Sequence, residues 1–134
     1  MRIYVAPAAD AEWTELTDGT GPAVRVAASD LQHAQRVRAR VKADDGDVAV
    51  VLDVTVAVAR DFRSARLVLG TSDSDASVHY VGTVDGLAGL IADIGSAEVA
   101  DGVTLIPASP RQDVHALGQL VLSRLAVRRQ ARAS

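Results

Sequence analysis

Cysteine is absent from this 134-residue chain. The absence excludes disulfides, thiolate nucleophiles, cysteine-based zinc sites and iron–sulfur clusters. Aromatic residues are scarce too, because the sequence holds only Tyr4, Trp13, Phe62 and Tyr80. With so few rings on which bases can stack, and a formal net charge of −3, the composition argues against nucleic acid as a partner.

Long apolar runs are missing as well. No stretch approaches the roughly 20 apolar residues of a membrane-spanning helix. The opening MRIYVAPAAD lacks the long apolar region of a secretory signal. We therefore expect a cytoplasmic protein with no membrane partner. No His, Asp and Glu group has metal-ligand spacing, and the acidic runs DDGD and TSDSD lack the full spacing of a calcium loop, so no metal is predicted.

Hydrophobic residues make up 49% of the chain, and they are mainly Ala, Val and Leu. Side chains of this kind suit tightly packed strands and helices. The length fits one domain with a real core and is too short for two ordinary domains. We place that domain at residues 1–127 and expect the charged end RRQARAS, residues 128–134, to be frayed.

Short apolar strands alternate with helical patterns along the sequence. Strands are expected at 3–6, 23–28, 48–59 and 102–108. Helices are expected at 11–16, from residue 31 to about 41, at 60–70, at 83–95 and from residue 109 onward, where Ser109 and Pro110 form a start signal. No hairpin turn is apparent. The alternation predicts an α/β protein of four parallel β-α units joined by right-handed crossovers.

The stretch YVGTVDGLAGL, residues 80–90, places three glycines around the expected start of a helix. Its spacing, G-x-x-x-G-x-x-G, matches neither the dinucleotide fingerprint nor the Walker loop. Thr83 is positioned as the N-cap residue. Two interpretations stay open at this point: a loop that contacts a cofactor phosphate, and a turn that leads from a strand into a packed helix.

A family resemblance rests on this region. The segment YVGTVDGLAGLIADIGSAEVADGVTLIPAS, residues 80–109, with the amphipathic helix after it, resembles the C-terminal end of the luciferase-like monooxygenase family. These are flavin- or deazaflavin-dependent oxidoreductases built on an eight-stranded β/α barrel. The segment RVRARVKADDGDVAVVLDVTVAVARD, residues 36–61, is similar to the family's helix, acidic turn and seventh strand. The resemblance implies the C-terminal half of a TIM-like (β/α)8 barrel, without the N-terminal strands that carry much of the flavin contact.

The resemblance also implies where a cofactor, FMN or coenzyme F420, would bind. The family holds the cofactor phosphate on backbone amides after its fifth strand, a position that corresponds to Ala8 and Ala9 here, and the VGT loop adds Gly82 and Thr83. The family commonly has Ser-Gly where this chain has Ala8 and Ala9. The binding of no cofactor at all is therefore an equal expectation.

Two further residues are candidates for a polar site, although no catalytic residue is predicted. Asp53 interrupts an apolar strand, and a buried carboxylate costs several kcal/mol unless it is paired. A structural ion pair, with Arg25 as the partner, is the favoured interpretation, and a functional carboxylate is the other. His79 precedes the VGT loop near the carboxyl end of the sheet, where barrel enzymes place their active sites.

Four strands cannot close a barrel and would leave open edges and an uncovered apolar face. We expect a homodimer, or a partner chain, to complete the barrel; a flattened open sheet is the third possibility. Two functions follow: a truncated luciferase-like, flavin- or F420-dependent monooxygenase or oxidoreductase, and a non-catalytic binding or assembly protein on the same scaffold. Whether the chain is an enzyme stays open at this point.

Overall fold

The structure is a computed structural model that describes residues 1–8, 11–69, 78–110 and 112–133. For residues 62, 68, 69 and 129–133 it describes the backbone alone. In chain order the elements are β1 (Arg2–Val5), β2 (Thr14–Glu15), β3 (Ala23–Val26), α1 (Leu31–Asp44), β4 (Ala49–Val58), α2 (Phe62–Leu69), β5 (Val78–Gly82), α3 (Val84–Ser96), β6 (Gly102–Pro107) and α4 (Val114–Ala133).

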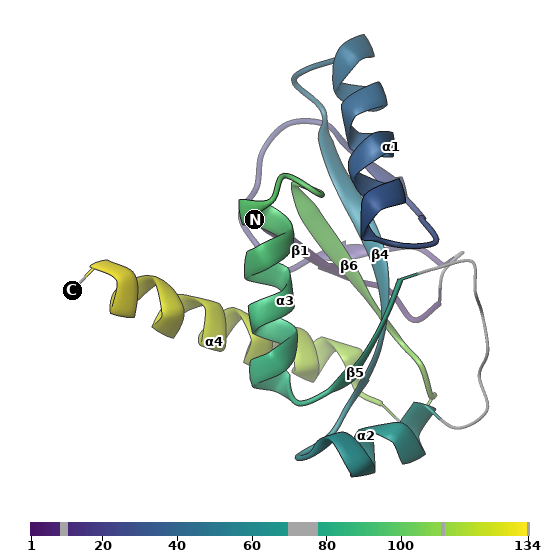
Figure 1. The fold of residues 1–134 in the computed structure, drawn as a ribbon, viewed down its shortest axis with the longest axis vertical. Coiled ribbons are helices and arrows are strands. Elements are labelled where there is room, and N and C mark those ends of the chain that lie inside the picture. The colour runs from purple at the N-terminus through teal and green to yellow at the C-terminus, as the bar shows by residue number, and fades with distance from the viewer. Residues whose placement is uncertain (9–10, 70–77, 111, 134) are drawn as a thin grey trace.

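The strands form one six-stranded, mostly parallel sheet that curls like half of a barrel (Figure 1). The strand order is β2-β1-β6-β4-β3, and β5 also pairs with β4. The central strand β4 pairs with β3 through residues 49–52 and with β5 through residues 54–58. Only β2 runs antiparallel, against β1. The expectation of a mixed α/β chain with parallel β-α units is confirmed at this level.

The helix predicted at residues 11–16 is wrong, because this segment contains β2, the second strand of a hairpin with β1. Contacts with residues distant in sequence hold this segment as a strand. The Arg2 guanidinium binds Glu15 with an Nη2–Oε1 distance of 2.8 Å, and the Ile3 backbone N–H donates to the Thr17 hydroxyl. Trp13 stacks on Tyr4. The prediction that the chain has no hairpin is therefore wrong as well.

The sheet also differs from the predicted four strands in number and order. The segment β5 was expected only as the approach to a helix, yet it pairs with β4 in parallel. The first strand, β1, lies beside the last strand, β6, and not beside β3. In a β/α barrel, strands that follow one another in sequence are neighbours. The sheet therefore has the curl of a half-barrel with a different strand order.

One face of the sheet is covered by α1, α3 and α4, whose buried side chains form a single apolar cluster with the strands. Fully buried members include Ile3 on β1, Leu52 on β4 and Leu105 on β6, and each contributes about 1.5–3 kcal/mol by leaving water. The strands' large apolar side chains on this face are covered within the single chain. The uncovered apolar face was predicted on the other side of the sheet, and there Val51, Ala57 and Ile106 are buried as well, so no such face is found among the described residues.

Two of the expected helix starts are confirmed, and one is wrong. The Asp30 carboxylate accepts from His33 N–H at the start of α1, and the Thr83 hydroxyl accepts from Gly86 N–H at the start of α3. The last helix starts at residue 114 and not near Ser109, because the Asp113 carboxylate caps it by accepting from Ala116 N–H at 3.0 Å. The backbone of α4 stays helical to residue 133.

The hairpin gives the fold a predictable acid sensitivity. The Arg2 guanidinium, with the Thr17 hydroxyl, lowers the pKa of Glu15 from 4.5 to about 2. A carboxyl whose folded pKa is depressed stabilises the fold above pH 4.5 and loses this contribution as the pH falls toward 2. We expect Glu15→Gln to cost about 1–2 kcal/mol at pH 7, with allowance for solvent screening. Urea unfolding at pH 7 and pH 3 measures this, and a cost of the same size at both values contradicts it.

Candidate functional site

Polar and aromatic side chains gather on the sheet face opposite the helix-covered core. We call Tyr4, Trp13, Arg25, Asp53 and Thr104 the opposite-face cluster. Asp53 pairs in register with Thr104 across β4 and β6, and Thr104 pairs with Tyr4 across β6 and β1. Because successive residues of a strand point to opposite faces, these residues alternate with the core residues beside them.

The Arg25 guanidinium is the centre of the opposite-face cluster. Its Nε donates to Asp53 Oδ1 at 2.7 Å, and its Nη1 and Nη2 donate to the carbonyl oxygens of Ala11 at 2.6 Å and Ala8 at 3.2 Å. The predicted partnership of Arg25 with Asp53 is confirmed. Arg25 therefore ties β3, β4 and the segment after β1 together through one side chain.

The aromatic rings of Tyr4 and Trp13 also lie on this face of the sheet. The ring centroids of Tyr4 and Trp13 lie 4.0 Å apart with planes 14° from parallel. The Arg25 guanidinium carbon lies 6.0 Å from the centroid of the Trp13 ring, and that of Arg2 lies 5.5 Å from the Tyr4 centroid. Both distances are within the range of cation–π attraction. The stack holds Trp13, the residue before the edge strand β2, against this face of the sheet.

Two polar residues of the cluster are almost entirely buried: Asp53 is 5% exposed and Thr104 is 0% exposed. Burial raises the pKa of the Asp53 carboxyl, and the hydrogen bond from Arg25 opposes this shift. Within the part of the chain that the structure describes, the Thr104 hydroxyl has no hydrogen-bond partner. Chemically, the cluster holds a fixed ion pair beside one hydroxyl whose hydrogen-bonding capacity is unused.

Thr104 permits a direct test of that unused capacity. Valine has nearly the shape of threonine and lacks the hydroxyl, so Thr104→Val removes a buried polar group that has no partner. Since such a group costs about 1–3 kcal/mol, we expect the variant to be more stable by about 1 kcal/mol in urea unfolding. A loss of stability would show that the hydroxyl has a partner in solution. Thr55→Val, at a half-buried position on the same face, is the control.

The structure places His79 on the same face as Asp53. His79 lies on β5 in register with Thr55, which is two residues after Asp53 on β4. The two predicted polar residues are therefore one strand apart on a common surface. His79 is half-buried and is the second residue of β5, three residues before Gly82 of the VGT loop.

The glycines of the YVGTVDG stretch make room for a side chain of the protein itself. The Tyr80 hydroxyl donates to the Thr83 carbonyl at 2.9 Å. A Cβ atom added to Gly82 or Gly86 would collide with that hydroxyl. Thr83 caps α3 through its own hydroxyl. The spacing of Gly82 and Gly86 is thus explained by the packing of Tyr80 over the start of α3.

A double-mutant cycle tests this explanation. In a helix, Gly→Ala usually stabilises by about 1 kcal/mol, but Gly86→Ala is expected to destabilise by about 1–2 kcal/mol because of the collision with Tyr80. In a Tyr80→Phe background the colliding oxygen is gone, so the same substitution should be neutral or stabilising. Gly46→Ala, in the turn after α1, is the control for a glycine without a collision, since its Cβ would meet nothing closer than 3.9 Å. Equal costs in both backgrounds would contradict the explanation.

The segment after β1 presents carbonyl oxygens at the position implied for phosphate binding. Ala8 is exposed, and its carbonyl accepts from Arg25 Nη2 and from Ala11 N–H. Ala9 lies outside the described residues. Phosphate is bound by N–H groups, whereas the described contact at Ala8 turns a carbonyl toward a cation.

The carboxyl end of the central strand is occupied by Gln112. Its amide donates to the Val58 carbonyl at 3.0 Å and accepts from the Val58 N–H at 3.4 Å, which continues the hydrogen-bond pattern of a strand. Beside it lies a shallow hollow of about 390 Å³, lined by Val84, Leu117 and Leu120 among others. Parallel α/β sheets usually bind ligands at this end, and this hollow is mainly apolar.

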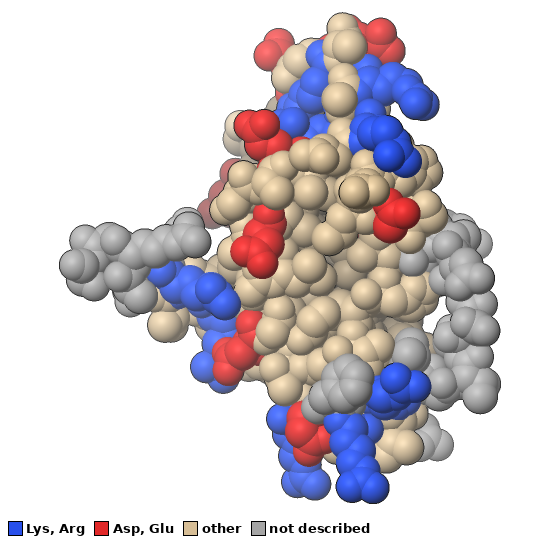
Figure 2. All heavy atoms as spheres, in the orientation of Figure 1, with Lys and Arg blue, Asp and Glu red and all other residues tan. Residues whose placement is uncertain are grey.

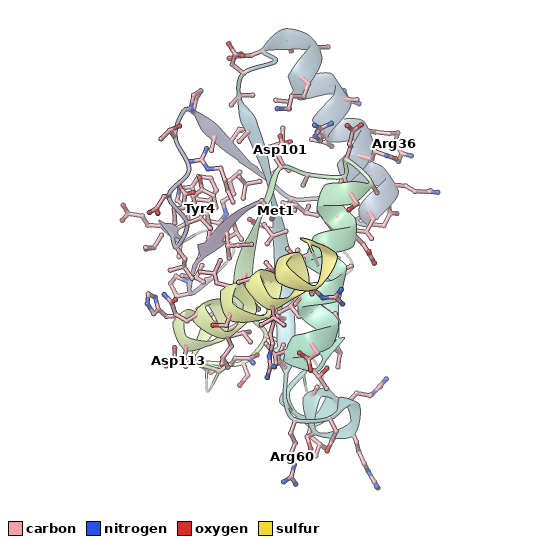
Figure 3. The ribbon with its side chains drawn as sticks, turned by 90° about the vertical axis from the view of Figure 1, so that its left-hand side faces the viewer. Met1, Tyr4, Arg36, Arg60, Asp101 and Asp113 are labelled. Atoms are coloured by element: carbon pink, nitrogen blue, oxygen red, sulfur yellow. The ribbon has the colours of Figure 1, made fainter. Side chains whose placement is uncertain are left out.

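A larger groove, of about 720 Å³, lies between α3, α4 and the residues that follow β2. Leu16, Ala92, Leu122 and Leu125 contribute apolar surface, and Asp18 and Arg128 contribute opposite charges. Met1 also lines it, and Figure 3 shows Met1 beside α4. Within the described residues, neither Asp18 nor Arg128 makes an ion pair.

Sequence reasoning missed three contributors to these sites. Thr104 stands in the apolar strand GVTLIP much as Asp53 stands in its strand, so the same signal was available for it. The stacking of Trp13 on Tyr4 has no local signal, because it depends on the hairpin. The groove has no local signal either, because it forms where α3 and α4 pack against each other.

Comparison of the chain with protein-family models finds no match, and comparison with curated proteins finds none either. Among the residues that the structure describes, no group of three His, Asp or Glu side chains could hold a metal ion. None of the described helices combines the length and the apolar character needed to cross a membrane.

Proposed function

We propose that this chain is a non-catalytic binding or assembly protein that acts as a homodimer. The proposal keeps the sequence resemblance of the β-α units and the VGT loop to the C-terminal half of a luciferase-like barrel, although the order of the strands differs from that of such a barrel. The observation that carries the proposal is the packing of Tyr80 over Gly82 and Gly86, because it fills with protein atoms the loop where the resemblance puts a cofactor.

The segment after β1 supports the same proposal. The Ala8 carbonyl and the neighbouring Ala11 carbonyl receive the guanidinium of Arg25. A bound phosphate would need these backbone groups to turn over and would leave Arg25 with Asp53 alone. The open groove beside α4, in contrast, offers apolar surface to a partner.

The other function is a truncated monooxygenase or oxidoreductase that uses FMN or coenzyme F420. It predicts that the cofactor raises the unfolding temperature in a thermal-shift experiment. A ligand at 100 times its Kd stabilises a protein by about 2.7 kcal/mol, which is a rise of roughly 10 °C for a domain of this size. We expect the unfolding midpoint to be unchanged by millimolar FMN or by saturating coenzyme F420.

Tyr80→Phe and Arg25→Met, measured with the same ligands, show whether these side chains block a latent cofactor site. We expect no ligand-dependent shift in either variant. A rise of several degrees with either cofactor in the wild-type protein would contradict the non-catalytic proposal and support the oxidoreductase.

A further inference from the structure

The groove beside α4 combines apolar walls with two opposite charges that lack partners within the described residues. Asp18 and Arg128 are both exposed, while Leu16, Leu122 and Leu125 are half-buried. We infer that the occupant of this groove is the α4 helix of a second copy of the chain. The inference rests on the proposed homodimer and names the surface through which it forms.

A surface that carries both charges can pair with itself about a two-fold axis. In such an isologous interface, residue i of one copy contacts residue j of the other, and j contacts i. The two α4 helices then cross in antiparallel fashion. Arg128 of each copy meets Asp18 of the other, so one kind of contact satisfies all four charges.

The charge distribution along the chain favours this occupant. Residues 124–134 contain four arginines, at positions 124, 128, 129 and 132, and no acidic residue. The whole chain has 14 basic and 17 acidic residues, so the remainder has 10 basic and 17 acidic residues and a formal charge of −7. The basic end of α4 is therefore attracted to the acidic body of a second copy.

The position of α4 makes the contact sterically accessible. The C-terminal turns of α4 extend away from the rest of the molecule (Figure 1). In Figure 2 basic side chains lie on the part of α4 nearest this extension, and acidic side chains lie among uncharged surface beside them over α3. Leu122 and Leu125 face the groove beside the small residue Ala92 of α3, and the Met1 side chain lies against Gly95, where an added Cβ would be 3.0 Å from Met1 Cε.

Charge reversal tests this interface without disturbing the core. Asp18→Arg places two like charges at each contact of the dimer, and Arg128→Asp does the same with the opposite sign. We expect each variant alone to dimerise at least about tenfold more weakly than wild type in analytical ultracentrifugation. Mixed in equal amounts, the two variants regain opposite charges at both contacts, so the mixture should form a heterodimer within about threefold of the wild-type Kd.

The control is Arg36→Asp, which makes the same change of net charge as Arg128→Asp on an exposed residue of α1, away from α4 (Figure 3). It should leave the dimer Kd within about threefold of wild type. Circular dichroism checks that all variants are folded.

The possible outcomes separate the inference from the proposed function. A wild-type dimer that neither reversal weakens would overturn the groove as the interface and leave the homodimer standing. Two weakened variants that fail to dimerise with each other would overturn the reciprocal pairing. A wild-type protein that stays monomeric would contradict the homodimer itself.

Discussion

Asp53→Ala is expected to destabilise the protein by about 3–5 kcal/mol. The substitution leaves the Arg25 guanidinium on the sheet face without its 2.7 Å partner. The Arg25 side chain is only 18% exposed and that of Asp53 only 7%. Removing one member of a buried pair costs this much because the remaining charge is uncompensated. Urea unfolding followed by circular dichroism measures the loss.

Two comparisons give this prediction a sharp control. Arg25→Met combined with Asp53→Leu removes both charges and should cost clearly less than Asp53→Ala alone. Arg60→Ala breaks an exposed pair, with Asp61 at 3.8 Å and a side chain 90% exposed, and should change stability by less than about 0.5 kcal/mol. If Asp53→Ala costs no more than Arg60→Ala, the cluster does not hold the sheet and hairpin together.

Asp101→Ala has the second-largest expected effect, a loss of about 2–3 kcal/mol. One carboxylate oxygen accepts from Arg38 at 3.1 Å, and the other accepts from the Val50 N–H at 2.9 Å and from Lys42 at 3.0 Å. Asp101 directly precedes β6, so its side chain joins this strand to α1 and β4. Hydrogen bonds to a charged group contribute more than neutral ones, which explains the size of the expected loss.

The pH dependence of Asp101→Asn separates the charge from the hydrogen bond. Asparagine can still accept from the Val50 N–H but carries no charge. Burial raises the pKa of Asp101, but the hydrogen bonds from Val50, Lys42 and Arg38 together outweigh it and lower the pKa below its usual value. Its contribution is therefore present above pH 3.8 and is lost as the pH falls below that value. We expect Asp101→Asn to cost about 1 kcal/mol at pH 7 and less at pH 3; an equal cost at both would contradict the assigned role.

Local patterns in the sequence were sufficient to predict four of the six strands. The apolar runs around Ile3, Leu52 and Leu105 and the segment 23–28 correspond to β1, β4, β6 and β3, because a strand that is covered on both faces consists mainly of apolar residues. The start of α1 at residue 31 and the cap Thr83 were also predictable, since helix starts depend on neighbouring residues alone. The Arg25–Asp53 pair followed from the cost of burying a lone carboxylate.

The remaining features depend on contacts between distant segments, which no local pattern encodes. The strand β2 forms because Trp13 and Glu15 find Tyr4 and Arg2 on β1. The position of β1 beside β6 is equally non-local. The spacing of Gly82 and Gly86 left open both a loop that contacts a cofactor phosphate and a turn into a packed helix; here the deciding contact is local, since the space belongs to Tyr80 of the same segment, but the spacing alone does not say where that side chain lies.

The mass of the protein in solution tests the central claim most directly. Sedimentation equilibrium over a wide range of protein concentration should give about 28 kDa at the upper end, which is twice the 14.0 kDa chain mass. The mass should decrease toward that of the single chain on dilution. A mass that stays at 14.0 kDa at every concentration would contradict the account.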